Sequence, residues 1–259
     1  MTSPSFPFST ALITGASSGI GRALALVLAQ GGVRLALTAR RQSELEDIVR
    51  MARQLGSEAF IFPADLSRPA EAFRVAAEAE NGLGRIDLLI ANAGVGKTAP
   101  LVNLPWEDIE RMMMVNALGS MAIIRAVLPG MIAQGSGVIA GISSLAAYRG
   151  MPFSSAYSAS KAALSTFLES MRVETRRQGI SVIDIHPGYI RTPMTAVNKH
   201  PMPFLMEVDR AASLILRAIL RKKPVYDFPW QMGWLLRIAR LLPPSFFDRV
   251  VERSVPGRR

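Results

Sequence analysis

The sequence contains no cysteine and only two histidines, His186 and His200. The absence of cysteine excludes disulfides, thiolate metal sites and a cysteine nucleophile, and it fits a reducing compartment. Two histidines are too few for a multi-histidine metal site, so no resident metal is expected. The N-terminal stretch MTSPSFPFSTALITG has no basic segment followed by an apolar one, and no apolar run approaches the roughly 18 residues of a spanning helix. We therefore expect a cytoplasmic protein without a signal peptide or spanning helix.

Acidic residues are scarce in the last fifth of the chain. The formal net charge is +10, and residues 210–259 account for most of it, with 11 Lys+Arg against 3 Asp+Glu. Residues 1–209 are close to balance, with 19 Lys+Arg against 17 Asp+Glu. A basic end of this kind is typical of proteins that bind nucleic acid or an anionic membrane surface. No recognised DNA- or RNA-binding module is present, so we expect no nucleic-acid partner.

Charged residues make up 19% of the chain and hydrophobic residues 49%, a composition that supports a large core. Over residues 1–190, short apolar runs alternate with amphipathic stretches. The runs expected to be strands are Ala11–Thr14, Val33–Thr38, Ala59–Phe62, Ile86–Ala91, Val138–Ile142 and Ser181–Ile185. The stretches expected to be helices are Gly19–Gln30, Gln42–Leu55, Pro69–Asn81, Pro105–Ala133 and Ser155–Gln178. This order predicts a single-domain α/β Rossmann fold, a doubly wound parallel β-sheet with helices on both faces.

A glycine-rich turn, TGASSGIG at residues 14–21, joins the first expected strand to the first helix. Gly15 permits a tight turn, Gly19 lets the backbone approach a pyrophosphate, and Gly21 lets the helix pack on the sheet. Amides at the start of the helix then favour phosphate groups. The spacing G-x-x-x-G-x-G in the first βα unit favours a dinucleotide ligand over a purely structural turn.

The end of the second expected strand reads Leu37-Thr38-Ala39-Arg40-Arg41 and carries no acid. A site specific for NAD usually places Asp or Glu there to bind the ribose 2′-hydroxyl. An arginine instead binds a 2′-phosphate through a planar, charge-assisted fork. We therefore predict NADP(H) as the cofactor, with Arg40 as the main contact and Arg41 as a second. The alternative is that both arginines lie on a solvated helix start.

Tyr157 and Lys161 lie four residues apart, about one helical turn, so their side chains share one helix face. A phenol with its usual pKa of roughly 10 is a poor base at neutral pH. A neighbouring lysine ammonium favours the phenolate and would lower that pKa. The pair therefore predicts a tyrosine that exchanges a proton with a substrate oxygen. A surface pair on an amphipathic helix is the alternative.

Four motifs follow one another along the chain: TGASSGIG at residues 14–21, Asn92-Ala93-Gly94, Tyr157-x-x-x-Lys161 and Pro187-Gly188. In this order and at these intervals they resemble the short-chain dehydrogenase/reductase family over roughly residues 9–225. The resemblance implies an enzyme of EC 1.1.1 type that interconverts a carbonyl and a secondary alcohol with NADP(H), with Tyr157 as acid/base. The alternative function is a non-catalytic NADP(H)-binding sensor or scaffold. The resemblance also implies a homo-oligomer, with a dimer favoured over a tetramer, built on the helices at residues 105–133 and 155–178.

The resemblance assigns residue roles. Asn116, Ser144, Tyr157 and Lys161 match the catalytic residues, with Ser143 as the alternative to Ser144. Asp65 matches the adenine contact, and Thr192 matches the nicotinamide carboxamide contact. The alternative is that Asn116 and Thr192 only cap or bend helices. The full set of expected cofactor-binding residues is Gly15, Ser17, Ser18, Gly19, Ile20, Gly21, Arg40, Arg41, Asp65, Leu66, Asn92, Ala93, Gly94, Tyr157, Lys161, Pro187, Gly188, Ile190 and Thr192.

Two segments lie outside these motifs. Residues 193–207, PMTAVNKHPMPFLME, follow the last motif and would cover the substrate. Three methionines there favour a hydrophobic small-molecule substrate, although these residues could instead pack on the domain. Residues 1–228 are expected to form the catalytic domain, and residues 229–259 a basic amphipathic extension. In the extension, apolar residues recur at helical spacing beside arginines, which suits a helix in a membrane interface. The alternatives are packing on the core or on a partner subunit.

Overall fold

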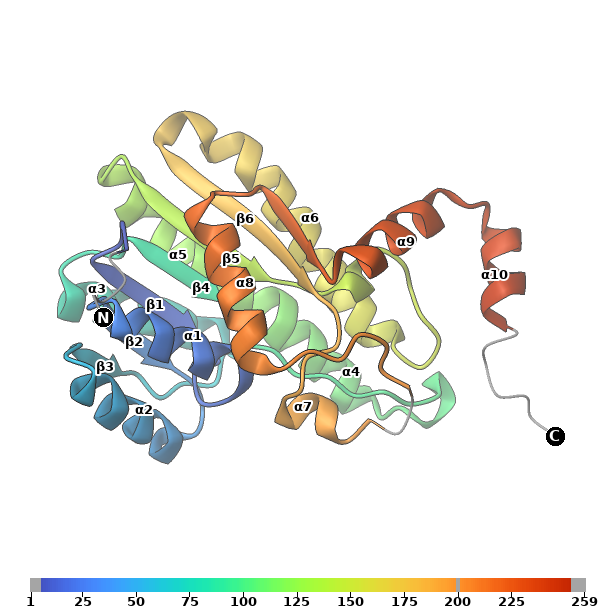
Figure 1. Cartoon of the computed structure of the whole chain (residues 1–259), viewed down its shortest axis with the longest axis horizontal. Helices are drawn as coiled ribbons and strands as arrows, with labels where there is room; N and C mark the ends of the chain where they lie inside the picture. The colour runs from blue at the N-terminus through green and yellow to red at the C-terminus, as the bar shows by residue number, and fades with distance from the viewer. Residues whose placement is uncertain (1–5, 199–200, 253–259) are drawn as a thin grey trace.

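A computed structural model describes residues 6–198 and 201–252. Seven parallel strands form one sheet in the order β3-β2-β1-β4-β5-β6-β7 (Figure 1). Their bounds are β1 Thr10–Thr14, β2 Arg34–Thr38, β3 Ala59–Ile61, β4 Leu88–Ala91, β5 Gly137–Ile142, β6 Ile180–Pro187 and β7 Val225–Phe228. The predicted doubly wound α/β fold is confirmed, with each predicted strand within a few residues of its predicted bounds.

Helices cover both faces of the sheet. Their bounds are α1 Gly19–Gln30, α2 Gln42–Gln54, α3 Pro69–Leu83, α4 Trp106–Met112, α5 Ser120–Ala133, α6 Ser155–Thr175, α7 Pro193–Ala196, α8 Val208–Leu220, α9 Trp230–Leu241 and α10 Pro244–Glu252. Leu12 and Ile13 are neighbours on β1, yet they belong to cores on opposite faces of the sheet because strand side chains alternate. The core with Ile13 includes α1, α2 and α8, and the core with Leu12 includes α3, α5 and α6.

The predicted helix Pro105–Ala133 is interrupted by a π-helical segment, η2 Met113–Gly119, which joins α4 to α5. Such wide turns are rare and occur frequently at functional sites. By length and composition, the stretch Trp106–Ala133 could cross a membrane, which the sequence did not lead us to expect. Half of its most apolar window is buried inside the protein, as in the core helix of a soluble domain.

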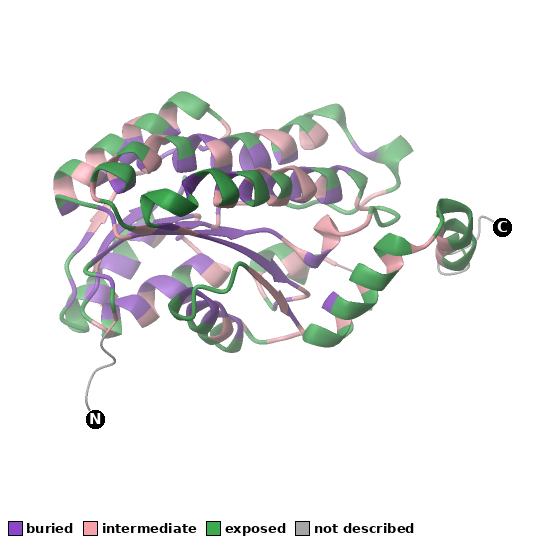
Figure 2. Ribbon diagram, turned by 90° about the horizontal axis from the view of Figure 1, so that it is seen from above, coloured by how far each residue is buried: buried purple, intermediate pink, exposed green. Residues whose placement is uncertain are grey.

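The last two helices extend from the sheet domain. In Figure 2 most of α9 and α10, which extend toward the C-terminus at the right, is coloured as exposed, whereas most of the sheet is coloured as buried. The chain turns at Leu242, and α10 begins at Pro244, because a proline cannot continue the hydrogen bonding of α9. Of the predicted extension, residues 253–259 lie outside the described residues, as do residues 199–200 of the predicted substrate-covering segment.

Candidate functional site

A cavity of about 400 Å³ lies at the carboxyl ends of the strands. β1 pairs with β2 on one side and β4 on the other, so the strand order reverses at β1 and leaves a crevice there. Ligands of open α/β sheets bind in this crevice. The cavity is lined by the turn after β1, the start of α2, the end of β4, the loop after β5, the side of α6 and the segment after β6.

Glycine geometry explains the shape of the turn after β1. Gly15 and Gly19 have φ values of +65° and +54°, a region that side chains with a Cβ rarely adopt. A Cβ on Gly15 would lie 2.7 Å from the Cα of Ala93, and one on Gly21 would lie 2.5 Å from the carbonyl oxygen of Gly15. The turn is therefore pressed against the end of β4. Ser18, the N-cap residue of α1, makes no side-chain cap, so the first amides of α1 face the cavity edge without that partner.

Asn92 fastens the end of β4 to the glycine turn. Its Nδ2 donates to the carbonyl oxygens of Thr14 at 2.9 Å and Gly15 at 3.2 Å. The Thr14 hydroxyl in turn accepts from the backbone amides of Asn92 and Ala93, each at 2.9 Å. These bonds hold the two cavity walls at a fixed distance while Ala93 and Gly94 line the space between them.

Two arginines lie at the end of the cavity that β2 supplies. Arg40 and Arg41 both line it, together with Asp65 and Leu66 from the loop after β3. Arg41 Nη2 donates to the Ser17 hydroxyl at 3.0 Å, which ties it to the glycine turn. Arg41 also pairs with Glu44 at 3.2 Å, so Arg40 is the less engaged of the two. This end of the cavity therefore carries positive charge beside a loop of backbone amides, as a phosphate group requires.

Tyr157, Ser144 and Lys161 meet at the opposite end of the cavity. All three line it, Tyr157 and Lys161 from one face of α6 and Ser144 from the loop after β5. Burial raises the pKa of the Tyr157 phenol, and hydrogen bonding with Ser144 offsets part of that rise. Ser144 Oγ also accepts from the amide of Ala146 at 3.1 Å, which fixes its position. The phenol is thus held protonated at the cavity wall.

The predicted lowering of the Tyr157 pKa by Lys161 is wrong for this arrangement. Lys161 is buried, and its Nζ donates to the carbonyl oxygen of Ile142 at 2.7 Å. Burial lowers the pKa of Lys161 to about 8, and attraction to Asp184 opposes that change. Lys161 is therefore only partly charged near pH 8, and its Nζ donates its hydrogen bond to the backbone of β5.

Asn116 supports this end of the cavity from behind. It is fully buried in the π-helical segment, and its Oδ1 accepts from the Val95 amide at 2.7 Å. Its Nδ2 donates to the Val95 carbonyl oxygen at 2.8 Å and to the Ser160 hydroxyl at 2.9 Å. A Cβ on Gly94 would lie 3.3 Å from Asn116 Oδ1 and 3.4 Å from Lys161 Nζ. The asparagine, the lysine and the loop after β4 therefore pack closely together, and Asn116 does not cap its helix.

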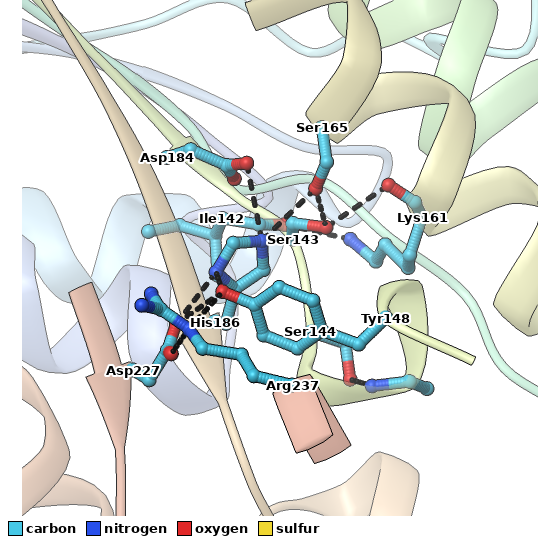
Figure 3. A network of polar contacts seen from close by, with 11 residues as sticks. Ile142, Ser143, Ser144, Tyr148, Lys161, Ser165, Asp184, His186, Asp227 and Arg237 are labelled. Carbon is cyan, nitrogen blue, oxygen red and sulfur yellow. Dashed lines mark hydrogen bonds and ion pairs between the residues drawn. The ribbon is translucent and has the colours of Figure 1, made fainter. Parts of the chain in front are cut away.

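A buried polar network lies next to the lysine (Figure 3). His186 Nδ1 is 2.9 Å from Asp227 Oδ1, and His186 Nε2 is 3.1 Å from Asp184 Oδ2. Burial opposes the charged imidazole, but the two aspartates outweigh it and raise the pKa of His186 to about 9. Ser165 Oγ lies 3.0 Å from His186 Nε2 and donates to Ser143 Oγ at 2.8 Å.

Ser143 connects the network to α6, because its hydroxyl donates to the backbone carbonyl oxygen of Lys161 at 3.0 Å. Both serines line the cavity, but their hydroxyls differ in partner: Ser144 is hydrogen-bonded with Tyr157, whereas the Ser143 hydroxyl is engaged in the network. This separation favours Ser144 over the alternative that the sequence left open.

The structure brings nearly all predicted site residues to one cavity. Gly21 and Asn116 are the two that do not line it, and both pack directly behind its wall. Lining residues that the sequence did not suggest are Ala39, Ala64, Val95, Val115 and Ile142. The cavity is also lined by Ser143, the alternative to Ser144, and by Pro193, Met194 and Thr195 of the predicted substrate-covering segment. The network around His186 was also not predicted. Its only signal in the sequence is two acids, Asp184 and Asp227, in otherwise apolar strands.

Comparison with known proteins agrees with this geometry. Residues 9–202 match the family described as short chain dehydrogenase. An uncharacterized oxidoreductase of Myxococcus xanthus (strain DK1622) is 41% identical over 246 residues, which cover 95% of this chain and 97% of the relative. Residues 9–202, which match the family, contain every residue that lines the cavity.

Solved structures give the same result at lower identity. The crystal structure of levodione reductase superimposes with a TM-score of 0.80 at 25% identity and covers 88% of this chain and 99% of its own. An alcohol dehydrogenase from the archaeon Thermococcus sibiricus, complexed with 5-hydroxy-NADP, has a TM-score of 0.76 at 27% identity. That match covers 85% of this chain and 95% of the archaeal one.

Proposed function

The chain belongs to the short-chain dehydrogenase/reductase family and has the oxidoreductase fold of that family; from this premise we propose that it is an NADP(H)-dependent reductase of hydrophobic ketones. One observation carries the proposal: a protonated phenol, a serine hydroxyl and a buried lysine meet at one end of a cavity whose other end carries two arginines. The reverse reaction, oxidation of a secondary alcohol, uses the same groups.

The residues present fit a dinucleotide. The glycine turn leaves no room for side chains where it meets β4, so backbone amides can approach a pyrophosphate. Arg40 and Arg41 at the end of β2 suit a 2′-phosphate, and residues 37–41 include no acid. The archaeal neighbour complexed with 5-hydroxy-NADP supports the choice of NADP(H). Asp65 and Leu66 would flank the adenine, and Pro187, Gly188, Ile190 and Thr192 the nicotinamide half.

NADP(H), when bound, supplies or accepts the hydride. Ser144 would donate a hydrogen bond to the substrate carbonyl oxygen and hold it beside the phenol. Tyr157 would then give that oxygen its proton; its raised pKa keeps the proton available at neutral pH. Lys161 would bind ribose hydroxyls, and Asn116 would hold the Val95 loop in place. The protein's share of the chemistry is orientation and proton transfer.

A hydrophobic substrate is supported by the side chains around the cavity opening. Met194 lines the cavity, and Val197 and Phe204 on the same segment are exposed rather than packed on the domain. The neighbour named levodione reductase is named for a ketone substrate, which supports a carbonyl compound as the substrate class. The family acts on diverse small molecules, and the fold alone does not select among them.

We also propose a homodimer built on the long helices. Three large apolar side chains on their outer surfaces are exposed: Leu118 on the π-helical segment, Ile132 on α5 and Val173 on α6. A second copy would cover them. Size-exclusion chromatography with light scattering of the Val173→Glu variant tests this surface, because a buried charge there would shift the dimer to monomer.

The test of the activity is oxidation of NADPH, followed by absorbance, across ketones graded by chain length. Tyr157→Phe should keep the Kd for NADPH within a few-fold and lower kcat by at least about 100-fold, since general acid catalysis contributes roughly 10²–10⁴. Retained turnover in this variant would contradict the assigned acid. NADPH binding without turnover of any ketone or alcohol in either direction would favour the sensor or scaffold alternative.

A further inference from the structure

The helix α9 is attached to the domain by one of its faces. Gly233 is buried there, and a Cβ on it would lie 2.6 Å from the Asp227 Cβ, so α9 sits directly on the end of β7. Arg237 Nε lies 2.8 Å from Asp227 Oδ2 and 3.3 Å from the Tyr148 hydroxyl. Figure 3 shows Arg237 reaching from α9 to the network around His186. This attachment fixes α9 relative to the loop after β5, which carries Tyr148 and Ser144.

Arg149 holds the junction between α9 and α10. Its Nη1 lies within hydrogen-bond distance of the carbonyl oxygens of Ala239 at 3.3 Å, Arg240 at 3.2 Å and Leu242 at 3.4 Å. Its guanidinium also stacks over the Phe247 ring of α10, 4.1 Å from the centroid. Arg149 follows Ser144 closely in the loop after β5, so both terminal helices are fastened to the loop that carries a catalytic residue.

The opposite face of α9 is apolar and uncovered. We call it the apolar stripe; its members on α9 are between 55% and 85% exposed, and we include two exposed apolar residues of α10, which lie one helical turn apart. Its members are Trp230, Trp234, Leu235, Ile238, Leu241, Phe246 and Val250. A group of large exposed apolar side chains, on helices attached to the domain, is typical of an interaction site.

A second group of exposed apolar side chains lies on the segments that follow β4, β5 and β6, each of which also contributes residues to the cavity wall. Its members, the cavity rim, are Leu101, Val102, Trp106, Met151, Phe153, Met194, Val197 and Phe204. Backbone and side-chain bonds join the segments of the rim: the Ala99 amide donates to the Phe153 carbonyl oxygen at 3.0 Å, and the Thr98 hydroxyl donates to Asn198 at 3.2 Å. The three segments that carry the rim are therefore joined to one another.

The apolar stripe begins beside the cavity. The Gly188 amide donates to the Phe228 carbonyl oxygen at 2.7 Å, Gly188 lines the cavity, and α9 starts two residues after Phe228. Met151 and Phe153 of the rim follow Arg149, which holds α9 and α10. Both the stripe and the rim therefore lie at the carboxyl edge of the sheet. This is the end of the molecule from which α9 and α10, here called the arm, extend in Figures 1 and 2.

The charge of the arm indicates what covers this surface. Residues 229–259 contain six arginines and two acids, and Arg240 and Arg249 are exposed beside the stripe. Apolar side chains next to arginine suit the interface of a bilayer, where anionic headgroups attract the cations and the acyl boundary takes up Trp and Leu. A second copy on this surface would bring two cationic arms together, which like-charge repulsion disfavours.

We propose that α9 and α10 lay the apolar stripe into the surface of an anionic membrane, with the cavity rim against the same surface. The cavity then opens toward lipid, and a ketone dissolved in the bilayer reaches Tyr157 without crossing water. The substrate route rests on the proposed function; the docking itself does not.

Vesicle flotation tests the docking without any need for activity. The full chain should bind vesicles of phosphatidylcholine mixed with phosphatidylserine more tightly than pure phosphatidylcholine vesicles by roughly tenfold or more, and high salt should weaken the binding. Trp234→Gln combined with Ile238→Gln should abolish it. The control, Leu55→Gln combined with Phe73→Gln, removes two exposed apolar side chains outside the stripe and rim and should bind like the unchanged chain. A water-soluble ketone should be reduced equally by both variants.

Tryptophan fluorescence tests the orientation, because the chain has three tryptophans and all belong to the stripe or the rim. Lipids with brominated acyl chains should quench both a Trp106→Phe variant, which keeps Trp230 and Trp234, and a Trp230→Phe, Trp234→Phe variant, which keeps only Trp106. Absence of binding to anionic vesicles, or a concentration-dependent dimer that the Gln variant loses, would overturn the docking. Quenching on the arm without quenching of Trp106 would overturn the placement of the cavity rim.

Discussion

His186 and Asp227 face each other as register partners on β6 and β7, with Nδ1 2.9 Å from Oδ1. Asp184 lies 3.1 Å from the other ring nitrogen, so the imidazole is held between two carboxylates inside the domain. An imidazolium satisfies both acids, whereas a neutral ring leaves one without its partner. The same arrangement raises the pKa of His186 to about 9 from 6.5. The charged histidine therefore lies between Tyr148, in the loop after β5, and Asp227, which pairs with Arg237 of α9.

We predict a loss of stability with rising pH that depends on His186. A group whose pKa is raised on folding stabilises the fold fully below its unfolded pKa, here 6.5, and loses that contribution as pH rises through about 9. The free energy of unfolding of the unchanged chain, minus that of His186→Gln, should shrink by roughly 2–3 kcal/mol over this window. Urea unfolding at several pH values measures it.

The comparison with the variant is needed because Lys161 acts in the opposite direction. The pKa of Lys161 is lowered from 10.5 to about 8, because its burial disfavours the charged form. Its contribution to the free energy of unfolding therefore increases as the pH rises from about 8 to 10.5. The total stability of the unchanged chain therefore declines less steeply above pH 8 than His186 alone would dictate. Parallel pH profiles of the two proteins would contradict the role of His186.

The sequence was sufficient to predict the order of strands and helices, because the strands are buried on both faces and read as short apolar runs. It could not predict the cluster at His186. Asp227 lies 41 positions along the chain from His186, and their contact depends on β7 adding beside β6 in register. The π-helical segment around Asn116 was also missed, since hydrophobic periodicity does not distinguish one wide turn from a regular helix.

We predict that Gly19→Ala weakens NADPH binding by roughly tenfold or more. The residue has φ +54°, and a Cβ there would lie 3.1 Å from Thr192 Cγ2 across the cavity wall. The matched control is Gly32→Ala, which has φ +74° and open space around the new methyl group. Both variants should lose about 1–2 kcal/mol of stability from the left-handed backbone. Fluorescence titration with NADPH separates them; equal affinities would contradict the role of the turn.

We predict that cofactor preference follows the end of β2. Ala39→Asp combined with Arg40→Leu removes a cation and adds an acid at the cavity end where a 2′-phosphate is proposed. A hydrogen bond to a charged group contributes about 1.5–3 kcal/mol, so the ratio of kcat/KM for NADPH over NADH should fall by roughly 10–100-fold. Arg50→Leu on the exposed side of α2 is the control and should leave the ratio unchanged. An unchanged ratio in the double variant would exclude Arg40 as the phosphate contact.

For some site residues the sequence predicts the identity of the residue but not the contacts of its side chain. The resemblance placed Asn116 among the catalytic residues, whereas its contacts are with the Val95 backbone and Ser160, and the side chain does not line the cavity. The sequence carries the identity of such a residue but not its partners, because those partners depend on how η2 packs against α6 and the loop after β4. A supporting role is therefore the sharper hypothesis for Asn116.

We predict that Asn116→Leu destabilises the fold and lowers kcat together. Leucine is of similar size, but it leaves the partly buried amide and carbonyl of Val95 without their side-chain partner, at a cost of roughly 1 kcal/mol for each group. Ser160→Ala is the matched control, since it removes one bond to Asn116 and keeps both bonds to Val95. It should cost about 1 kcal/mol and preserve kcat. Urea unfolding and steady-state kinetics of both variants test this, and equal losses would show that the Val95 loop is not what Asn116 holds in place.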